Sequence, residues 1–220
     1  ILARDTVRFV GEGIALVVGV SPELAREAAE LIDVEFEPLS PLTNMREASE
    51  FCFDWEAGDR KAVDHAFSNA FHTTSFETVF NRIAVSPLET RAAIGEYNSK
   101  YGFRLHVQSQ GVHHIRNVLA DTVLGISRDQ LQVLTDDVGG AFGMKVSAFP
   151  EYALVLHAAR QLGLPVKWVS SRTEAFLSDT HGRDQIVQAD VAFDNNGRIV
   201  GLQASNLSSM GAYVTGDGPE

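Results

Sequence analysis

The sequence is poor in cysteine and has no concentration of positive charge. Cys52 is the single cysteine in 220 residues, which excludes an internal disulfide and any metal cluster held by several cysteines. Lysine and arginine number 18 against 29 acidic residues, so the formal net charge is −11, and no basic run occurs. We therefore expect neither nucleic acid nor an anionic membrane surface as a partner.

Long apolar runs and a signal peptide are also missing. The longest apolar runs, such as residues 14–20 and 152–156, are too short to span a bilayer. We expect no membrane association and a cytoplasmic location. The 45% of hydrophobic residues is ample for a packed core. Because the chain starts at Ile1 and finishes in a loop-like tail, residues 215–220, we expect it to be a piece of something longer.

The most informative stretch is a glycine-rich loop at residues 136–145, Asp-Asp-Val-Gly-Gly-Ala-Phe-Gly-Met-Lys. Gly139, Gly140 and Gly143 permit positive φ and leave the backbone bare, so another molecule can approach its N–H groups closely. Lys145 adds a positive charge, and the combination favours an anionic ligand. A tight strand-to-helix turn without any ligand fits the spacing equally well.

Residues in and beside the loop disfavour other chemistries. A P-loop requires Gly directly before its Lys and Ser or Thr directly after, where this sequence has Met144 and Val146. The dinucleotide fingerprint fails because Val138 occupies its first glycine position. A nucleotide-binding enzyme that places the loop lysine on phosphate is therefore disfavoured. Asp136 and Asp137 face opposite sides of an extended segment, so we expect one of them to cap loop amides rather than both to form a catalytic pair.

The first fifty residues are patterned as a small α/β unit. Residues 7–10 and 14–20 are predicted strands, Ser21 is a predicted helix N-cap followed by Pro and Glu, and residues 33–37 alternate as a third strand. No catalytic constellation accompanies them, so we interpret this region as scaffold. From about residue 38 to 71 the patterning weakens, which indicates a connector.

A predicted hairpin and helix precede the glycine-rich loop. Residues 91–97 and 103–109 are predicted strands, and the second has one apolar face and one polar face that continues to Gln110. A polar residue at this position contacts a ligand or caps the next helix, and the spacing does not choose between them. The helix is predicted to run from Gly111 to Gly125, and a further strand from Leu131 leads into the loop.

Regular elements are predicted after the loop as well. An apolar helix at about residues 151–162 is expected to be deeply buried, and a strand follows at 166–169. Residues 171–174 resemble a capping start of a short helix that ends at Leu177. The clearest hairpin joins strands at 187–193 and 200–204.

The histidines suggest no metal site. His65 and His72 lie seven residues apart in poorly patterned sequence, where solvated side chains are more common than metal ligands. His113 and His114 are adjacent in the first turn of a predicted helix, so they point about 100° apart and do not easily face one ion. We expect no protein metal ligand here.

Five stretches, taken in order, carry a family resemblance. They are residues 5–12 (DTVRFVGE), 25–29 (AREAA), 34–39 (VEFEPL), 86–91 (SPLETR) and 139–145 (GGAFGMK). The first three resemble a hammerhead-type α/β domain, the fourth an Asn-Pro-Met-Glu-Pro-Arg-like stretch, and the last a Gly-Gly-x-Phe-Gly-x-Lys motif. Together they resemble the large, molybdenum-binding subunit of the xanthine oxidase family of molybdenum hydroxylases.

The resemblance implies a set of cofactor-binding residues. They are Gln110, Gly139, Gly140, Ala141, Phe142 and Gly143. The loop would pass close to the molybdenum and its pterin, with Phe142 near the substrate pocket. The side-chain amide of Gln110 would lie beside an apical oxo ligand of the metal and beside the pterin. The pterin dithiolene binds the metal in this family, so no protein ligand is expected.

The resemblance also implies an activity. Family members are oxidoreductases that hydroxylate a carbon centre with oxygen from water, and electrons leave through iron–sulfur and FAD-binding subunits or domains. We expect molybdenum-molybdopterin, in its cytosine dinucleotide form, and a homo-oligomer of the full complex. The family's active-site glutamate lies far downstream, so we expect no catalytic residue within this chain and no activity of the chain alone. Val146 replaces the Glu of purine-oxidising members, which favours carbon monoxide, aldehydes or N-heterocycles, as in carbon-monoxide dehydrogenase or aldehyde oxidase.

We therefore predict an α/β (α+β) fold in three parts. Residues 1–50 are expected to be part of a hammerhead-type domain, 51–75 a connector, and 76–220 part of the first molybdenum-cofactor-binding domain. The rival hypothesis is a non-enzymatic α/β module that binds a small anion or a partner protein through its glycine-rich loop.

Overall fold

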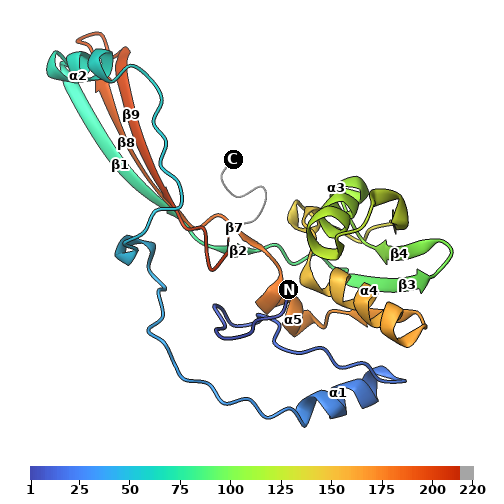
Figure 1. Ribbon diagram of the computed structural model, residues 1–220. Coiled ribbons are helices and arrows are strands. Elements are labelled where there is room, and N and C mark those ends of the chain that lie inside the picture. Colours follow the sequence, from blue (N-terminus) through green and yellow to red (C-terminus); the bar gives the residue numbers. More distant parts are fainter. Residues whose placement is uncertain (214–220) are drawn as a thin grey trace. The chain divides into compact units, whose positions relative to one another are not determined.

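The computed structural model describes residues 1–213, which form two compact units (Figure 1). The first unit combines residues 1–37 with 84–181, and the second combines residues 38–83 with the chain from Gly182 onward. Helices and strands are mixed in both, which confirms the predicted α/β class. The predicted loop-like tail at 215–220 lies outside the described residues.

A four-stranded sheet forms the centre of the first unit. Its strands, in spatial order, are β5 (Leu131–Leu134), β4 (Gly102–Val107), β3 (Ala92–Asn98) and β6 (Val166–Val169). The hairpin of β3 and β4 is antiparallel as predicted, β4 is parallel to β5, and β6 is antiparallel to β3. Strands β4, β5 and β6 therefore run in one direction, and their carboxyl ends lie at the same edge as the start of β3. This edge positions the candidate site.

Helix α4 (Pro150–Leu162) covers one face of this sheet (Figure 1). The helix is buried as its apolar sequence predicts, and Tyr152 and Leu156 are inaccessible to solvent together with Leu105 of β4. A Cβ at Gly95 in β3 would lie 2.6 Å from the backbone carbonyl of Val155. The absence of a side chain there lets α4 pack directly onto the strand.

Several of the remaining helices of the first unit begin or end at capping residues that the sequence predicts. They are α1 (Pro22–Glu30), α3 (Val112–Asn117), the π-helix η2 (Val118–Leu124), the 3₁₀ turns η3 (Arg128–Gln130) and η4 (Met144–Val146), and α5 (Arg172–Ser178). Ser21 caps α1 by accepting a hydrogen bond from Leu24 N–H, as predicted. Ser171 and Glu174 form the predicted capping box of α5. The helix predicted from Gly111 to Gly125 is present, although its second half widens to π geometry before Gly125 ends it at φ 62°.

The prediction of three strands near the N-terminus is wrong. Residues 7–10, 14–20 and 33–37 form no strand, and Val10 and Val20 are 78% and 96% exposed. A strand requires a hydrogen-bonded neighbour, and within residues 1–213 none lies beside these segments. Alternation in the sequence shows that a segment suits a strand, but it does not supply the neighbour.

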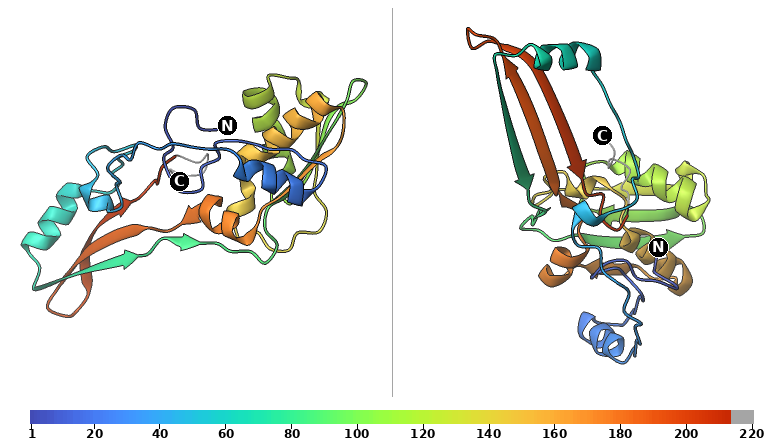
Figure 2. Two further views of the ribbon diagram at one scale, coloured as in Figure 1. Left: turned by 90° about the horizontal axis from the view of Figure 1, so that it is seen from below. Right: turned by 90° about the vertical axis from the view of Figure 1, so that its left-hand side faces the viewer.

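The second unit is a three-stranded antiparallel sheet with one helix against it. The strands lie in the order β1 (His72–Phe80), β8 (Gln185–Phe193), β9 (Ile199–Ser208), and the predicted hairpin of β8 and β9 is confirmed. Helix α2 (Arg60–Ser68) packs on β9 (Figure 2), where Gly201 leaves room for Ala66. Strand β1 was not predicted from the sequence. The short 3₁₀ turn η1 (Met45–Glu47) precedes α2 along the chain.

The range predicted as a connector, 51–75, contains α2 and the beginning of β1. The two-residue strands β2 (Ile83–Ala84) and β7 (His181–Gly182) lie where the chain passes from one unit to the other. The limits of the three predicted domain parts remain a prediction. Within residues 1–213, no helix is both long enough and apolar enough to cross a membrane.

Candidate functional site

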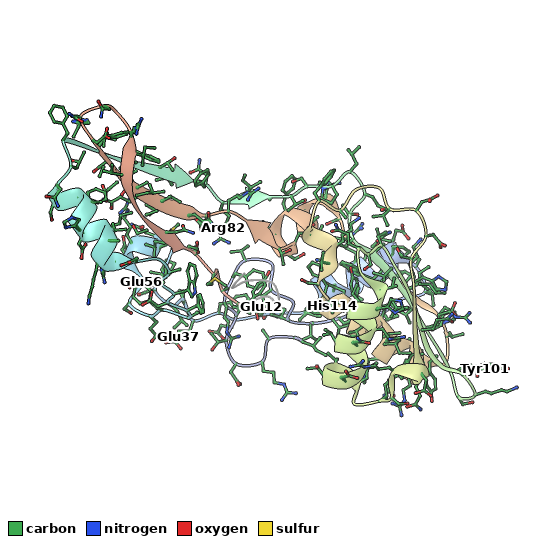
Figure 3. All side chains as sticks on the ribbon, turned by 90° about the horizontal axis from the view of Figure 1, so that it is seen from above. Glu12, Glu37, Glu56, Arg82, Tyr101 and His114 are labelled. Atoms are coloured by element: carbon green, nitrogen blue, oxygen red, sulfur yellow. The ribbon has the colours of Figure 1, made fainter. Side chains whose placement is uncertain are left out.

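Three segments that are distant in sequence meet at the strand-end edge of the first unit's sheet. Glu89 lies just before β3, Gln110 lies just after β4, and the glycine-rich loop follows β5. The turn between β3 and β4, with Tyr101 at its tip, lies at the opposite end of the sheet (Figure 3). The carboxyl ends of parallel strands are a common ligand-binding position in α/β folds.

Side chains from both neighbouring segments hold the ends of the glycine-rich loop. Gly139 N–H donates to Oε2 of Glu89 at 2.7 Å, and Gly143 N–H donates to Oε1 of Gln110 at 3.0 Å. Two backbone bonds reinforce these contacts, from Glu89 N–H to the Gly139 carbonyl at 3.2 Å and from Gln110 N–H to the Lys145 carbonyl at 3.1 Å. The structure thus brings Gln110 together with the glycine-rich loop.

The middle of the loop presents backbone donors with no acceptor. Within residues 1–213, the N–H groups of Gly140, Ala141 and Phe142 have no hydrogen-bond partner. The backbone φ is positive at Gly140 (100°), Phe142 (52°) and Gly143 (90°). Consecutive N–H groups in such a conformation form a concave site for an anion or an electron-rich oxygen. A positive φ at a non-glycine aromatic residue is a strained conformation of the kind found at functional sites.

Lys145 does not supply the free positive charge that the sequence predicts for this loop. Its side chain is fully buried, and Nζ donates to the Glu89 carbonyl at 2.9 Å and lies 3.4 Å from Glu89 Oε2. Burial lowers the pKa of Lys145, although the carboxylate of Glu89 opposes this shift. The lysine is therefore an internal partner of Glu89, and the hypothesis that it binds a phosphate is wrong.

The acidic residue that caps the loop is also different from the prediction. Glu89, and neither Asp136 nor Asp137, accepts the hydrogen bond from Gly139 N–H. Glu89 additionally accepts from Gln108 Nε2 at 3.3 Å, and Oε1 of Gln108 accepts from Ala92 N–H at 2.8 Å. The loop spacing does not identify Glu89, because fifty residues separate it from Gly139. Its place in the SPLETR stretch is the only sign of it in the sequence.

A buried arginine forms a second network behind the site. Arg91 is fully buried and donates to Asp179 through Nε at 2.6 Å, to Glu151 through Nη1 at 2.8 Å, and to Ser178 through Nη2 at 2.9 Å. Burial opposes the charged form, yet the two carboxylates outweigh it and raise the pKa of Arg91. The guanidinium also lies 3.8 Å from the centre of the Phe149 ring. This network ties the start of β3 to α4 and α5.

Two further features lie near the edge. The hydroxyl of Tyr152 is buried and, among the described residues, has no hydrogen-bond partner, and burial raises its pKa. On the sheet face that α4 leaves open, a hollow of about 520 Å³ is lined by residues that include Glu89, His106, Asp136, Asp137 and Lys167. The polar face predicted for the second hairpin strand therefore lines this hollow.

The histidines expected in poorly patterned sequence lie in regular elements, His65 in α2 and His72 at the start of β1, whereas His113 and His114 lie in the first turn of a helix as predicted. His113 and His114 are exposed in the first turn of α3, where Figure 3 labels His114, and His65 is exposed beside Asn69. In the described part of the chain, no three His, Cys, Asp or Glu side chains are grouped as a metal-ion site would require.

Comparison with known proteins identifies the family. Residues 44–219 match the family described as the molybdopterin cofactor-binding domain, and residues 1–40 match the aldehyde oxidase and xanthine dehydrogenase a/b hammerhead domain. The chain belongs to the molybdopterin cofactor-binding family. The resemblance to xanthine oxidase-family large subunits is thereby confirmed.

Sequence comparison with two related proteins supports this assignment. The chain is 34% identical to the nicotine 6-hydroxylase large subunit of Paenarthrobacter nicotinovorans, over 97% of this chain and 28% of that protein. It is 28% identical to the carbon monoxide dehydrogenase large chain of Hydrogenophaga pseudoflava, over 97% of this chain and 30% of that protein. The chain thus spans less than a third of the length of either relative.

Solved structures show the same fold. Quinoline 2-oxidoreductase from Pseudomonas putida 86 superimposes with a TM-score of 0.88 at 32% identity, over 98% of this chain and 29% of that one. Carbon monoxide dehydrogenase from Oligotropha carboxidovorans superimposes with a TM-score of 0.80 at 28% identity, over 85% of this chain and 26% of that one. The molybdopterin-binding fold is therefore established for this chain.

Proposed function

We propose that this chain is the molybdenum-cofactor-binding part of the large subunit of an oxidoreductase. The substrate class is a small molecule, an aldehyde, an N-heterocycle or carbon monoxide, and water supplies the oxygen. The observation that carries the proposal is the glycine-rich loop held between Glu89 and Gln110 with three N–H groups left open, in a chain of the molybdopterin-binding family. The relatives include a nicotine 6-hydroxylase, a quinoline 2-oxidoreductase and a carbon monoxide dehydrogenase.

The open donors suit an oxygen-rich cofactor. The N–H groups of Gly140, Ala141 and Phe142 would hold it by donating hydrogen bonds. The space beside Gly143 is open, since an added Cβ there would meet no atom within 4 Å. Oε1 of Gln110 accepts from Gly143 N–H, which supports a role in which the NH₂ group of Gln110 donates to the cofactor. When bound, molybdenum-molybdopterin supplies the redox centre at which the substrate is oxidised.

The substrate side of the proposal rests on Phe142 and Val146. Phe142 is 77% exposed at the head of the loop, so its ring is available to line a pocket. Val146 offers no carboxylate to bind a polar purine, which favours an apolar or small substrate.

The same proposal includes features of the whole enzyme. The cofactor is the cytosine dinucleotide form, electrons leave to iron–sulfur and FAD-binding subunits or domains, and the complex is a cytoplasmic homo-oligomer. The hammerhead part covers residues 1–50, the connector 51–75 and the cofactor-binding part 76–220. The isolated chain is inactive because the general base is supplied from elsewhere in the large subunit.

Metal and pterin analysis of the full-length gene product tests the proposal. After expression in a molybdenum-replete host, we expect molybdenum near one per chain, pterin fluorescence after oxidation, and turnover of an aldehyde, an N-heterocycle or carbon monoxide with a dye acceptor. Turnover by the isolated 220-residue chain would contradict its predicted inactivity. A full-length product with neither molybdenum nor pterin would instead favour the binding module.

A further inference from the structure

Glu89, which lies just before β3, contacts the glycine-rich loop through its carboxylate, its backbone N–H and its carbonyl. We propose that Glu89 and Lys145 form a charge-neutral clamp that sets the conformation of the glycine-rich loop before the cofactor binds. Glu89 is thus a positioning residue for the loop. Lys145 is the counter-charge that compensates the Glu89 carboxylate beside Gly139. The consequence for the cofactor rests on the proposed function, whereas the clamp itself does not.

The contacts of Glu89 reach both ends of the loop segment. Its carboxylate accepts from Gly139 N–H at 2.7 Å, and its own N–H donates to the Gly139 carbonyl at 3.2 Å. Its carbonyl accepts from Lys145 Nζ at 2.9 Å. One residue therefore joins the first glycine of the motif to its lysine, and the turn between them is closed as a ring.

The position of Gly139 depends on this clamp. A Cβ at Gly139 would lie 2.6 Å from the Cβ of Glu89, a separation that real Cβ atoms do not adopt. Gly139 has no positive φ, so backbone conformation is not the reason for a glycine here. The close approach of the Glu89 side chain is the reason, and it is what allows the bond of 2.7 Å.

The backbone on either side of Glu89 is fixed independently of the loop. Pro87 and Arg91 are both fully buried, and Arg91 is held by Asp179 and Glu151. The clamp thus transmits a position from the fixed start of β3 to the first glycine and the lysine of the loop. A hydrogen bond to a charged group is stronger than a neutral one, which suits this purpose.

The positive charge of Lys145 compensates the negative charge of the Glu89 carboxylate. An uncompensated carboxylate beside the open N–H groups of Gly140, Ala141 and Phe142 would repel an anionic ligand. Lys145 Nζ, 3.4 Å from Glu89 Oε2, cancels that charge, and its own burial keeps it away from the ligand. The donors then face the ligand without a net charge behind them.

Hydrogen–deuterium exchange of the cofactor-free, full-length protein tests the clamp directly. In Glu89→Ala, we expect exchange at Gly139 to rise at least about tenfold, because its N–H loses a charged acceptor. Glu96→Gln is the matched control, since Glu96 pairs with Arg104 at 3.7 Å on the same sheet, is 38% exposed against 36% for Glu89, and touches no loop residue. The control should leave loop exchange unchanged.

Charge variants test the counter-charge through cofactor content. Lys145→Met leaves the carboxylate uncompensated, so we expect the molybdenum and pterin content per chain to fall at least about fivefold. Glu89→Gln retains an oxygen for Gly139 N–H and is expected to lose less loop protection than Glu89→Ala. The double variant Glu89→Gln/Lys145→Met has no unpaired charge, and we expect it to hold more cofactor than Lys145→Met alone.

The two hypotheses fail in different ways. Wild-type exchange at Gly139 in the Glu89 variants, with a folded chain by circular dichroism, would overturn the clamp even if wild-type protein carries molybdenum. A double variant with no more cofactor than Lys145→Met would overturn the charge argument. If wild-type protein carries no cofactor but Glu89→Ala still releases the loop, the clamp stands and the proposed function is wrong. If Glu89→Ala does not fold, exchange in Glu89→Gln decides.

Discussion

Buried charge is concentrated at a few residues of the first unit, and each has a role that differs with its partners. Arg91 is surrounded by two carboxylates and an aromatic ring, so its charge is compensated on every side. Lys145 has one carboxylate and one carbonyl, so compensation is incomplete and its pKa falls. The two cations are therefore expected to respond differently to substitution and to pH.

Replacing Arg91 should lower the free energy of unfolding more than replacing a residue of a surface ion pair does. Arg91→Met leaves Asp179, a buried carboxylate, without its partner, and we expect the free energy of unfolding to fall by about 3–5 kcal/mol. Arg104→Met is the control, because Arg104 pairs with Glu96 at an exposed position and should change stability by less than about 1 kcal/mol. Urea unfolding of both variants measures the difference, and equal losses would contradict the prediction.

Lys145 should make stability depend on alkaline pH. Because folding lowers its pKa below the ordinary 10.5, the unfolded chain binds more protons than the folded chain between the two values. The unfavourable contribution of Lys145 is thus present at neutral pH and diminishes as pH rises through the folded pKa toward 10.5. We expect the unfolding free energy of wild type minus that of Lys145→Met to increase with pH in this window. A difference that stays flat or decreases would show that burial of the charge is not unfavourable.

At the scale of elements, contact between β3 and α4 determines how the core packs. Sequence patterning predicts both elements correctly, together with the β3–β4 hairpin, α1, α5 and the β8–β9 hairpin. It does not show that α4 lies on Gly95, since that contact joins residues about sixty positions apart. Local signals such as caps, turns and alternation are short in sequence, and packing partners are not.

Gly95→Ala should therefore destabilise the first unit. The added Cβ would lie 2.6 Å from backbone atoms of Val155, so strand and helix must separate, and we expect a loss of about 1–3 kcal/mol. Gly111→Ala provides a comparison, because the nearest atom there is 3.7 Å away and the φ is not positive. Its loss should remain below about 1 kcal/mol, as measured by thermal unfolding. A similar loss in both variants would argue against close packing at Gly95.

At the scale of the whole molecule, many large apolar side chains are exposed. Examples with more than half of their surface exposed are Val10, Val20, Leu31, Phe51, Trp55 and Leu88. Where such side chains gather into a contiguous patch, the patch marks a surface that binds a partner. The two relatives described above are more than three times its length, since the chain covers only 28% and 30% of them.

The 220-residue chain should consequently associate with itself. We expect sedimentation velocity to show larger species as concentration rises, and Phe51→Ser/Trp55→Ser to weaken this association by removing two exposed aromatic rings. Tyr101→Ser, which removes an aromatic residue of similar exposure at the hairpin tip, is the control and should have less effect. A single monomeric boundary at every concentration would refute the expectation.

The sequence by itself determined the family and most of the helices and strands between residues 92 and 204. Its glycines, caps and alternating strands are local features, and the motifs SPLETR and GGAFGMK lie in the order that the family requires. The resemblance, and not spacing, singled out Gln110 together with the glycine-rich loop as candidate cofactor-binding residues.

The tertiary structure decided which residues of the site are partners. Glu89 caps the loop in place of Asp136 or Asp137, and Lys145 turns inward to Glu89 and away from any ligand. It also left the predicted N-terminal strands unpaired, because a strand forms only beside a neighbour. In each case the deciding contact joins segments far apart along the chain, and only the direction of the strands brings them to one edge.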